Sequence, residues 1–294
     1  MTYLCGMSGN KLKLIECPRD AMQGLKEFIP TEQKVRYINQ LLNIGFDTID
    51  FGSFVSPKAI PQMKDTSQVL SMLNLNEHSS KLLAIIANER GAMDACAYEE
   101  ISYLGYPFSI SEEFQKRNTN ASLEESLKRV EEIQNLCLRS RKQLVVYISM
   151  AFGNPYGEKW HPDIAAQWSE RLFKDFDIRI IALSDTIGVS DPENISMLFS
   201  NLIPELPEVE FGAHLHTRPE TWKEKIESAW NSGCRRFDGA IKGFGGCPMA
   251  KDDLTGNMPT ENLLGYFEEI KVETGIDNKT FAEAQRIAEE IFPS

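Results

Sequence analysis

Residues 122–150 read SLEESLKRVEEIQNLCLRSRKQLVVYISM and join a helical pattern to a strand-like one. The first part predicts an amphipathic helix, because apolar residues recur every three or four positions. These residues are Leu123, Leu127, Val130, Ile133 and Leu136. The last part, QLVVYISM at 143–150, is a short run rich in apolar and β-branched residues, which predicts a buried strand.

The same alternation continues along the chain in both directions. The runs that predict strands are KLKLIEC (11–17), FDTIDFG (46–52), KLLAIIA (81–87), ISYLGY (101–106), QLVVYISM (143–150), IRIIALS (178–184), VEFGAHLH (209–216) and RRFDGA (235–240). Helical patterns lie at 31–45, 122–140, 191–203, 221–232 and 260–274, with a weaker one at 88–100. Thr31 and Asp191 are expected to cap two of these helices, the second with Pro192 in its first turn.

Eight strands that alternate with helices predict parallel pairing through right-handed crossovers. We therefore expect an α/β protein, a (β/α)8 TIM barrel over about residues 11–275, with a short C-terminal helix at about 277–292. The whole chain, 1–294, is expected to be a single domain. A doubly wound open sheet is the alternative, but the turn PRDAMQG (18–24) lacks the glycine-rich loop that is typical of that fold.

Composition excludes several classes of protein. The 294 residues include 31 Lys and Arg against 43 Asp and Glu, a formal net charge of −12, so no nucleic-acid partner is expected. No apolar run approaches the roughly 20 residues of a membrane helix, and no membrane association is expected. The N-terminus has no signal-peptide pattern. The six cysteines form no CxxC pair, which favours reduced thiols and a cytoplasmic location.

Polar residues gather where the predicted strands end, which is where TIM barrels hold their active sites. His214 and His216 are two residues apart in a strand-like run, so their side chains point to the same face. This spacing favours a chelated metal, and two hydrogen-bonded core histidines are the alternative. Asp20 and Asn257 can complete a nitrogen and oxygen ligand set, which favours Mg²⁺ or Mn²⁺ as the cofactor over zinc in a thiolate site.

Cys247 lies in a loop that follows the last predicted strand. Gly243, Gly245 and Gly246 precede it, and Pro248 follows it. Glycines allow a loop to close over a substrate, and a thiol at its tip can transfer a proton. An ordinary surface loop with an incidental cysteine is the alternative.

Several stretches, taken together, resemble the 3-hydroxy-3-methylglutaryl-CoA lyase family of metal-dependent TIM-barrel lyases. They are KLIECPRDAMQG, DFGSFVSPKAIPQM, LSDTIGV, GAHLHT and GFGGCPMAKDDLTGN, in the order of the family and spanning about residues 11–270. The Arg-Asp and HxH pairs are shared with related synthases and aldolases, whereas SFVSPK and the GGCP loop are specific to the lyases.

The resemblance implies a role for each residue that matches a family motif. The implied metal ligands are Asp20, His214, His216 and Asn257. Arg19 matches the arginine that contacts the thioester carbonyl oxygen, and Cys247 matches the catalytic cysteine of the lid. Asp185 and Glu261 match residues that support the site, and Ser53 belongs to the SFVSPK motif at the end of the second strand.

The chain departs from the family pattern at three informative positions. Asp50, expected to be catalytic, stands where a glutamate is usual and is one methylene shorter. Thr217 stands where an aspartate usually follows the HxH pair, and Asn154 stands where a cysteine is common. These changes leave the ligands, Arg19 and Cys247 in place, but they leave the exact acyl-CoA substrate open.

The implied reaction is cleavage of 3-hydroxy-3-methylglutaryl-CoA to acetoacetate and acetyl-CoA, a step of leucine degradation. CoA phosphates require local positive charge, which Lys58, Arg117 and Lys251 can supply. The family suggests a homodimer. One alternative is a sister enzyme: an acyl-CoA-dependent synthase, a 2-oxo-acid aldolase or a lyase for another 3-hydroxyacyl-CoA. The other alternative is a non-catalytic barrel that binds metal or CoA.

Overall fold

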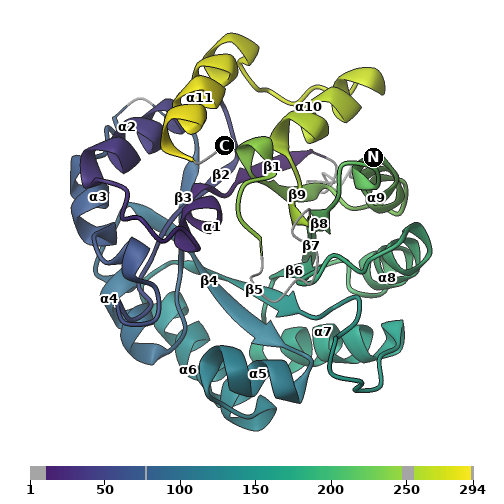
Figure 1. Ribbon diagram of the computed structural model, residues 1–294. Coiled ribbons are helices and arrows are strands. Elements are labelled where there is room, and N and C mark those ends of the chain that lie inside the picture. The colour runs from purple at the N-terminus through teal and green to yellow at the C-terminus, as the bar shows by residue number, and fades with distance from the viewer. Residues whose placement is uncertain (1–10, 77, 247–254, 293–294) are drawn as a thin grey trace, which may run out of the picture.

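A computed structural model of the chain describes residues 11–76, 78–246 and 255–292. Within this part of the chain, eight parallel strands close into a barrel in the order β1-β2-β3-β4-β5-β6-β7-β9 (Figure 1). They are β1 (Lys13–Glu16), β2 (Thr48–Ser53), β3 (Lys81–Ile85), β4 (Ile101–Ser109), β5 (Gln143–Ser149), β6 (Ile180–Ser184), β7 (Glu210–His214) and β9 (Arg236–Gly239). Each strand overlaps the run that predicted it, so the (β/α)8 TIM barrel is confirmed.

Helices surround the barrel and connect its strands (Figure 1). They are α1 (Pro18–Gln23), α2 (Thr31–Leu42), α3 (Thr66–Met72), α4 (Glu89–Cys96), α5 (Glu112–Thr119), α6 (Leu123–Arg139), α7 (Pro162–Phe176), α8 (Pro192–Glu205), α9 (Trp222–Asn231), α10 (Thr260–Glu269) and α11 (Asn278–Ile291), with short 3-10 helices η1 (Pro61–Met63) and η2 (Ile241–Gly243). The expected C-terminal helix is α11, which packs against α2. The assignment of the whole chain to one domain stays a prediction.

One expected helix cap is wrong and one is confirmed. Thr31 is the first helical residue of α2, Pro30 occupies the N-cap, and the Thr31 hydroxyl donates a hydrogen bond to Asp65 at 2.8 Å. Asp191 does cap α8, since its side chain accepts a hydrogen bond from the Asn194 N–H at 2.9 Å.

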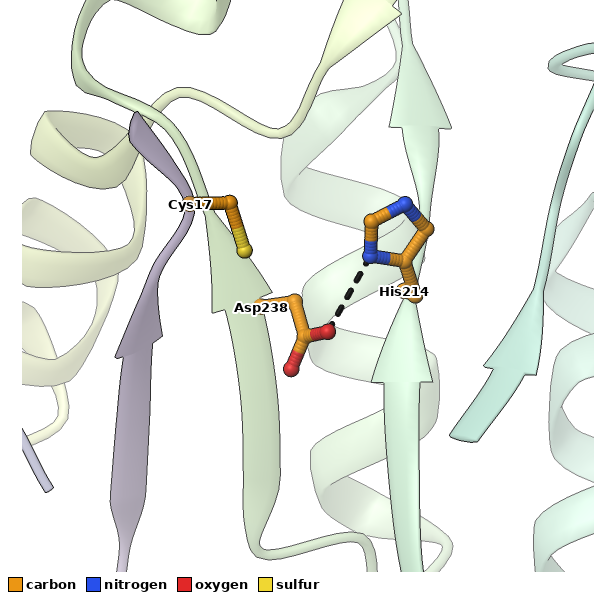
Figure 2. Close-up of side chains that lie close together, drawn as sticks. All are labelled: Cys17, His214 and Asp238. Carbon is orange, nitrogen blue, oxygen red and sulfur yellow. Dashed lines mark hydrogen bonds and ion pairs between the residues drawn. The ribbon is translucent and has the colours of Figure 1, made fainter. Parts of the chain in front are cut away.

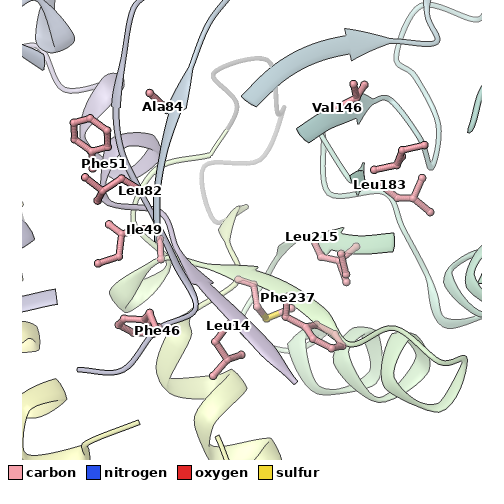
Figure 3. Packing of buried hydrophobic residues seen from close by; sticks show 14 of the residues in the cluster. Leu14, Phe46, Ile49, Phe51, Leu82, Ala84, Val146, Leu183, Leu215 and Phe237 are labelled. Atoms are coloured by element: carbon pink, nitrogen blue, oxygen red, sulfur yellow. The ribbon is translucent and has the colours of Figure 1, made fainter. Parts of the chain in front are cut away.

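Alternating strand residues form two separate apolar clusters. The outward-facing residues pack beneath the helices, and Figure 3 shows Leu82 and Val146 among them. Their neighbours Leu83 and Val145 belong to the smaller cluster inside the barrel. The interior also contains charged and polar side chains from β7 and β9, and these lie below the candidate site at the carboxyl end of the barrel.

A second, two-stranded sheet lies at the carboxyl end of the barrel. Strand β8 (His216–Thr217) pairs antiparallel with β10 (Gly256–Asn257), and the register places Asn257 opposite His216. This pairing brings a segment from beyond the glycine-rich loop to the end of β7. Among the described residues, no helix combines the length and the apolar character needed to cross a bilayer.

Candidate active site

The two histidines of the HxH pair point into one site. His214 Nδ1 lies 3.1 Å from Asp238 Oδ2, and His216 Nδ1 lies 3.1 Å from the carbonyl oxygen of Thr186. Because carboxylate and carbonyl oxygens accept, each Nδ1 donates and each Nε2 keeps its lone pair. The Nε2 atom of His216 is buried and has no hydrogen-bond partner among the described residues, so its lone pair fits a bond to a cation.

The two histidine rings differ in basicity. Burial lowers the pKa of His214, but the hydrogen bond and charge of Asp238 outweigh burial, so the pKa is raised. Burial and then the neighbouring His214 lower the pKa of His216. A neutral His216 is the form that can ligate a metal.

Asp20 and Asn257 complete the cluster. One ligand atom from each of Asp20, His214 and His216 lies within 4.8 Å of the other two. Asn257 Nδ2 donates to Asp20 Oδ2 at 2.7 Å and to the carbonyl oxygen of Phe244 at 2.8 Å, which leaves its Oδ1 available. Burial raises the pKa of Asp20, but Arg19, both histidines and Asn257 lower it more, to about 2. The described residues therefore contain a possible metal site whose oxygen and imidazole donors fit a divalent cation.

Gly245 allows the glycine-rich loop to pack directly onto this cluster. Its φ of +85° is unfavourable for other residues, and an added Cβ would lie 2.6 Å from the Asp20 carbonyl oxygen and 2.9 Å from Asn257 Nδ2. Gly246 lines the adjacent cavity. Cys247 and Lys251 lie outside the described residues.

Arg19 is held rigidly beside the cluster. Its Nε lies 3.0 Å from Asp50 Oδ2, and its Nη1 donates to Asp20 at 2.8 Å and to Gln23 at 2.9 Å. Burial raises the pKa of Asp50 to about 6 although Arg19 opposes the shift. Asp50 is only 1% exposed, and Arg19 lies on the cavity wall. Asp50 is therefore linked to the cavity through the guanidinium of Arg19.

The site opens into a cavity of about 350 Å³ whose lining is chemically mixed. The lining includes the polar side chains of Arg19, Asp20, His214 and His216 and the apolar side chains of Val55, Ile60, Ile85, Ala87 and Pro107. Such a pocket suits a ligand with a polar reacting end and an apolar substituent.

Four other expected site residues lie around the cluster. Asp185 is buried and accepts hydrogen bonds from Lys225 Nζ at 2.9 Å and from the Val189 N–H at 2.8 Å. Ser53 is buried, and its Oγ accepts from the Val55 N–H at 3.2 Å. These two residues shape the backbone at the ends of β6 and β2.

Glu261 and Lys58 lie farther toward the surface. Glu261 accepts a hydrogen bond from the Lys242 N–H at 2.9 Å and so holds the stem of the glycine-rich loop. Lys58 is exposed in the turn whose neighbours Ala59 and Ile60 line the cavity.

The positions that depart from the family pattern make local contacts. Asn154 Oδ1 accepts from the Tyr156 N–H at 3.0 Å and so closes a turn after β5. Thr217 Oγ1 lies 3.1 Å from Thr221 Oγ1.

Arg117, expected to contribute positive charge for CoA phosphates, places its guanidinium over the Tyr156 ring, 4.9 Å from the ring centroid. It directly precedes the cavity residues Asn118 and Thr119 in the chain.

Sequence reasoning missed two buried residues that hold the histidines. Lys225 on α9 donates to the His216 carbonyl oxygen at 2.8 Å, and Asp238 on β9 binds His214. Each is a charged residue within an otherwise apolar pattern, which is the signal that could have identified them.

A closed β/α barrel with an aspartate and two histidines at its carboxyl end defines a TIM-barrel enzyme with a site suited to a divalent metal. The family model described as HMGL-like matches residues 12–288, and the chain belongs to this family.

Relatives of known activity are similar over most of the chain. The cytoplasmic 3-hydroxy-3-methylglutaryl-CoA lyase of Rattus norvegicus is 32% identical over 93% of this chain and 79% of its own length. A Pseudomonas aeruginosa enzyme named 3-hydroxy-3-isohexenylglutaryl-CoA/hydroxymethylglutaryl-CoA lyase is 30% identical over 94% of this chain and 92% of its own.

A solved structure of the same kind is also similar. It is an HMG-CoA lyase of Acinetobacter baumannii in complex with coenzyme A and 3-methylmalate. It superimposes with a TM-score of 0.87 at 30% identity, covering 99% of this chain and 93% of the other.

Proposed function

We propose that the chain is a divalent-metal-dependent carbon–carbon lyase that cleaves 3-hydroxy-3-methylglutaryl-CoA to acetoacetate and acetyl-CoA. The observation that carries this function is the Asp20–His214–His216 cluster, which lines the same cavity as Arg19. Similarity to lyases of this name over most of the chain supports the same substrate.

The proposed metal ligands are Asp20, His214, His216 and Asn257, and the proposed cation is Mg²⁺ or Mn²⁺. The buried, unpartnered Nε2 of His216 and the low pKa of Asp20 support this set. When bound, the cation supplies positive charge that acidifies the tertiary hydroxyl of the substrate.

Arg19 stabilises the charge that develops when the bond breaks. As the tertiary hydroxyl loses its proton and becomes the ketone of acetoacetate, the electron pair of the broken bond moves into the enolate of acetyl-CoA. The Arg19 guanidinium is the cationic donor proposed to face the thioester oxygen. Asp50 and Gln23 hold that guanidinium in place and are positioning residues.

Two proton transfers complete the reaction. The hydroxyl proton must pass to a base, and the proposed candidates are Asp20, His214 or a water that they hold; Asp20 and His214 both line the cavity. A His214 ring that donates from Nδ1 to Asp238 and binds the cation through Nε2 has no free lone pair, so in its ligand role it can hold the water but cannot itself accept the proton. Cys247 is proposed to donate the proton that quenches the enolate, because the cavity-lining Gly246 directly precedes it.

The acyl-CoA substrate must pass its charged nucleotide over the rim of the cavity. We propose that Lys58 contacts CoA phosphates, since it is exposed beside cavity residues. Asp185, Glu261 and Ser53 are proposed to support the site through the backbone contacts described above. A homodimer, a cytoplasmic location and a place in leucine degradation stay predictions.

A panel of thioesters tests the proposed function. Purified protein with Mg²⁺ is incubated with 3-hydroxy-3-methylglutaryl-CoA, with the 3-isohexenyl analogue, with a 4-hydroxy-2-oxo acid, and with acetyl-CoA plus a 2-oxo acid. Formation of acetoacetate and acetyl-CoA in equal amounts from the first substrate is expected. Turnover of only the aldol or condensation substrates would assign the chain to a sister enzyme.

A further inference from the structure

The barrel interior below His214 is unusually polar. TIM-barrel interiors are filled mainly by branched apolar side chains. Here Glu210 and His214 on β7 face Arg236 and Asp238 on β9, and the residues of each pair are an even number of positions apart and so share the inner face. Arg236 is only 1% exposed and Asp238 only 3% exposed.

Asp238 contacts the lower edge of the His214 ring. Figure 2 shows its carboxylate between the ends of β1 and β7, with Oδ2 directed at His214 Nδ1, 3.1 Å away. Its other oxygen, Oδ1, is buried and has no hydrogen-bond partner among the described residues. The carboxylate therefore makes its one side-chain hydrogen bond to the histidine.

Arg236 precedes Asp238 by two residues on β9, so its side chain lies on the same inner face. Its Nη1 donates to Glu210 at 3.1 Å, whereas Nε and Nη2 are buried and lack partners within the described part of the chain. Gly212 makes room for it, because a Cβ there would lie 3.0 Å from Arg236 Cδ. Burial lowers the pKa of Arg236, and the charge of Asp238 is the largest of the effects that raise it above its ordinary value. Arg236 is thus a buried cation two residues from Asp238 on the same inner face, with its ion pair to Glu210.

We propose that Asp238 is a positioning residue for the lyase reaction, which holds the His214 ring with its proton on Nδ1 so that Nε2 faces the cation and the substrate, and that Arg236 is the buried counter-charge of Asp238. This inference rests on the proposed metal site. A carboxylate behind a ligating imidazole fixes the ring tautomer and orientation, and loss of such a partner typically lowers metal affinity about 10–100-fold.

Cys17 offers a competing interpretation of the same cluster. One ligand atom from each of Cys17, His214 and Asp238 lies within 4.8 Å of the others, so the three could form a metal site of their own (Figure 2). His214 Nδ1 is already engaged in a hydrogen bond to Asp238 at 3.1 Å, so the nitrogen nearest this carboxylate carries a proton and is not free to bind a cation, and the positioning role is favoured.

The substitution Asp238→Asn separates the two interpretations. Arg236 is a buried cation on the same inner face of β9, and its charge favours the orientation of the new amide in which the oxygen points toward Arg236 and the NH₂ group toward His214. That group donates to Nδ1 and forces the ring proton onto Nε2, where it blocks coordination. Cys17→Ala is the matched control, since it removes the third member of this cluster without removing the hydrogen bond between Asp238 and His214.

Two measurements read out the effect. Nitrogen-15 NMR of histidine-labelled, metal-free protein at alkaline pH reports the tautomer of each of the four histidines. Electron paramagnetic resonance reports Mn²⁺ affinity. We expect an Nδ1–H ring at His214 in the wild type, an Nε2–H ring in Asp238→Asn with about 10–100-fold weaker Mn²⁺ binding, and wild-type values in Cys17→Ala.

Each other outcome overturns the inference. A wild-type His214 that carries its proton on Nε2 refutes it even if Asp238→Asn fails to fold. So does a folded Asp238→Asn protein that binds Mn²⁺ as tightly as the wild type. Loss of Mn²⁺ affinity in Cys17→Ala would make the Cys17 trio the metal site. If the wild type binds no Mn²⁺, the proposed metal site fails, while the NMR tautomer still decides whether Asp238 positions His214.

Discussion

Arg19→Gln is expected to lower kcat for 3-hydroxy-3-methylglutaryl-CoA cleavage by about 10²–10³-fold, the scale for losing one donor to a developing oxyanion. The guanidinium lies on the cavity wall beside the Asp20–His214–His216 cluster, and a neutral amide cannot replace its charge. KM should change much less, because the contact is strongest in the transition state.

The same change leaves Asp50 buried without its counter-charge. The guanidinium contacts both carboxylate oxygens, with Nε at 3.2 Å and 3.0 Å, and loss of one partner of such a pair costs about 3–5 kcal/mol. The pKa of Asp50 is already raised from 3.8 to about 6 with Arg19 present, and it must rise further without it.

The destabilisation should therefore depend on pH. A carboxyl whose pKa is higher in the folded state binds a proton that the unfolded chain has released, so stability falls as pH rises toward the folded pKa. In the wild type, the free energy of unfolding stops falling near pH 6, where Asp50 has ionised in the folded state. In Arg19→Gln it continues to fall by about 1.4 kcal/mol per pH unit, because the folded-state pKa of Asp50 is higher. The free energies of unfolding of the two proteins should therefore diverge by roughly a further 2–3 kcal/mol between pH 6 and 8.

The double variant Arg19→Gln/Asp50→Asn separates catalysis from stability. It should recover the stability lost through Asp50 and lose the pH dependence that Asp50 causes, because neither position 19 nor position 50 then carries an ionisable group, while kcat stays as low as in Arg19→Gln. Urea unfolding at several pH values and initial rates of acetoacetate formation measure the two effects. Near-normal kcat in either variant would refute the oxyanion role, and a pH-independent stability difference would refute the pairing argument.

Three further predictions concern Glu16, Asp185 and Cys247. Glu16 is buried and its pKa is raised to about 8, so the folded protein loses stability when this carboxyl ionises at high pH. Glu16→Gln should therefore barely change Tm at pH 5 and raise Tm on the order of 5 °C at pH 9. An equal shift of Tm at both pH values would contradict this. Asp185→Asn should lower the free energy of unfolding in urea by about 3 kcal/mol, because buried Lys225 loses its charged partner. KM should stay within about threefold of the wild-type value. Normal stability would argue against the ion pair. Cys247→Ser should lower kcat about 10²-fold or more in steady-state assays, since a hydroxyl is a far weaker acid than a thiol; normal turnover would assign the proton to another group.

The barrel could be predicted from the sequence because its strands are short apolar runs separated by helical patterns. Helices α1 and α3 were missed because six and seven residues are too few to show a helical period. Helix α7 was missed although it is long, and its apolar residues Ala165, Trp168 and Leu172 do follow helical spacing.

The two histidines of the ligand cluster could be predicted because they are close together in the sequence. His214 and His216 are two residues apart in one strand-like run, and this spacing alone places them on one face. Their partners Asp238 and Lys225 come from other elements, so only the closed barrel brings them together. The resemblance marks Asp50 as catalytic; in the structure its carboxylate is buried against Arg19, and its part in catalysis stays a prediction.

The most direct measurement is the rate of acetoacetate formation by metal-free protein as Mg²⁺ is added, compared among the wild type, His216→Ala and the control His161→Ala. His216 Nε2 is buried and unpartnered, whereas His161 is exposed at the start of α7. The wild type and the control should be inactive after EDTA treatment and regain full activity with Mg²⁺, while His216→Ala should stay folded and inactive at every Mg²⁺ concentration. Full turnover by the metal-free wild type, or a normal Mg²⁺ response in His216→Ala, would contradict a metal-dependent lyase site at this cluster.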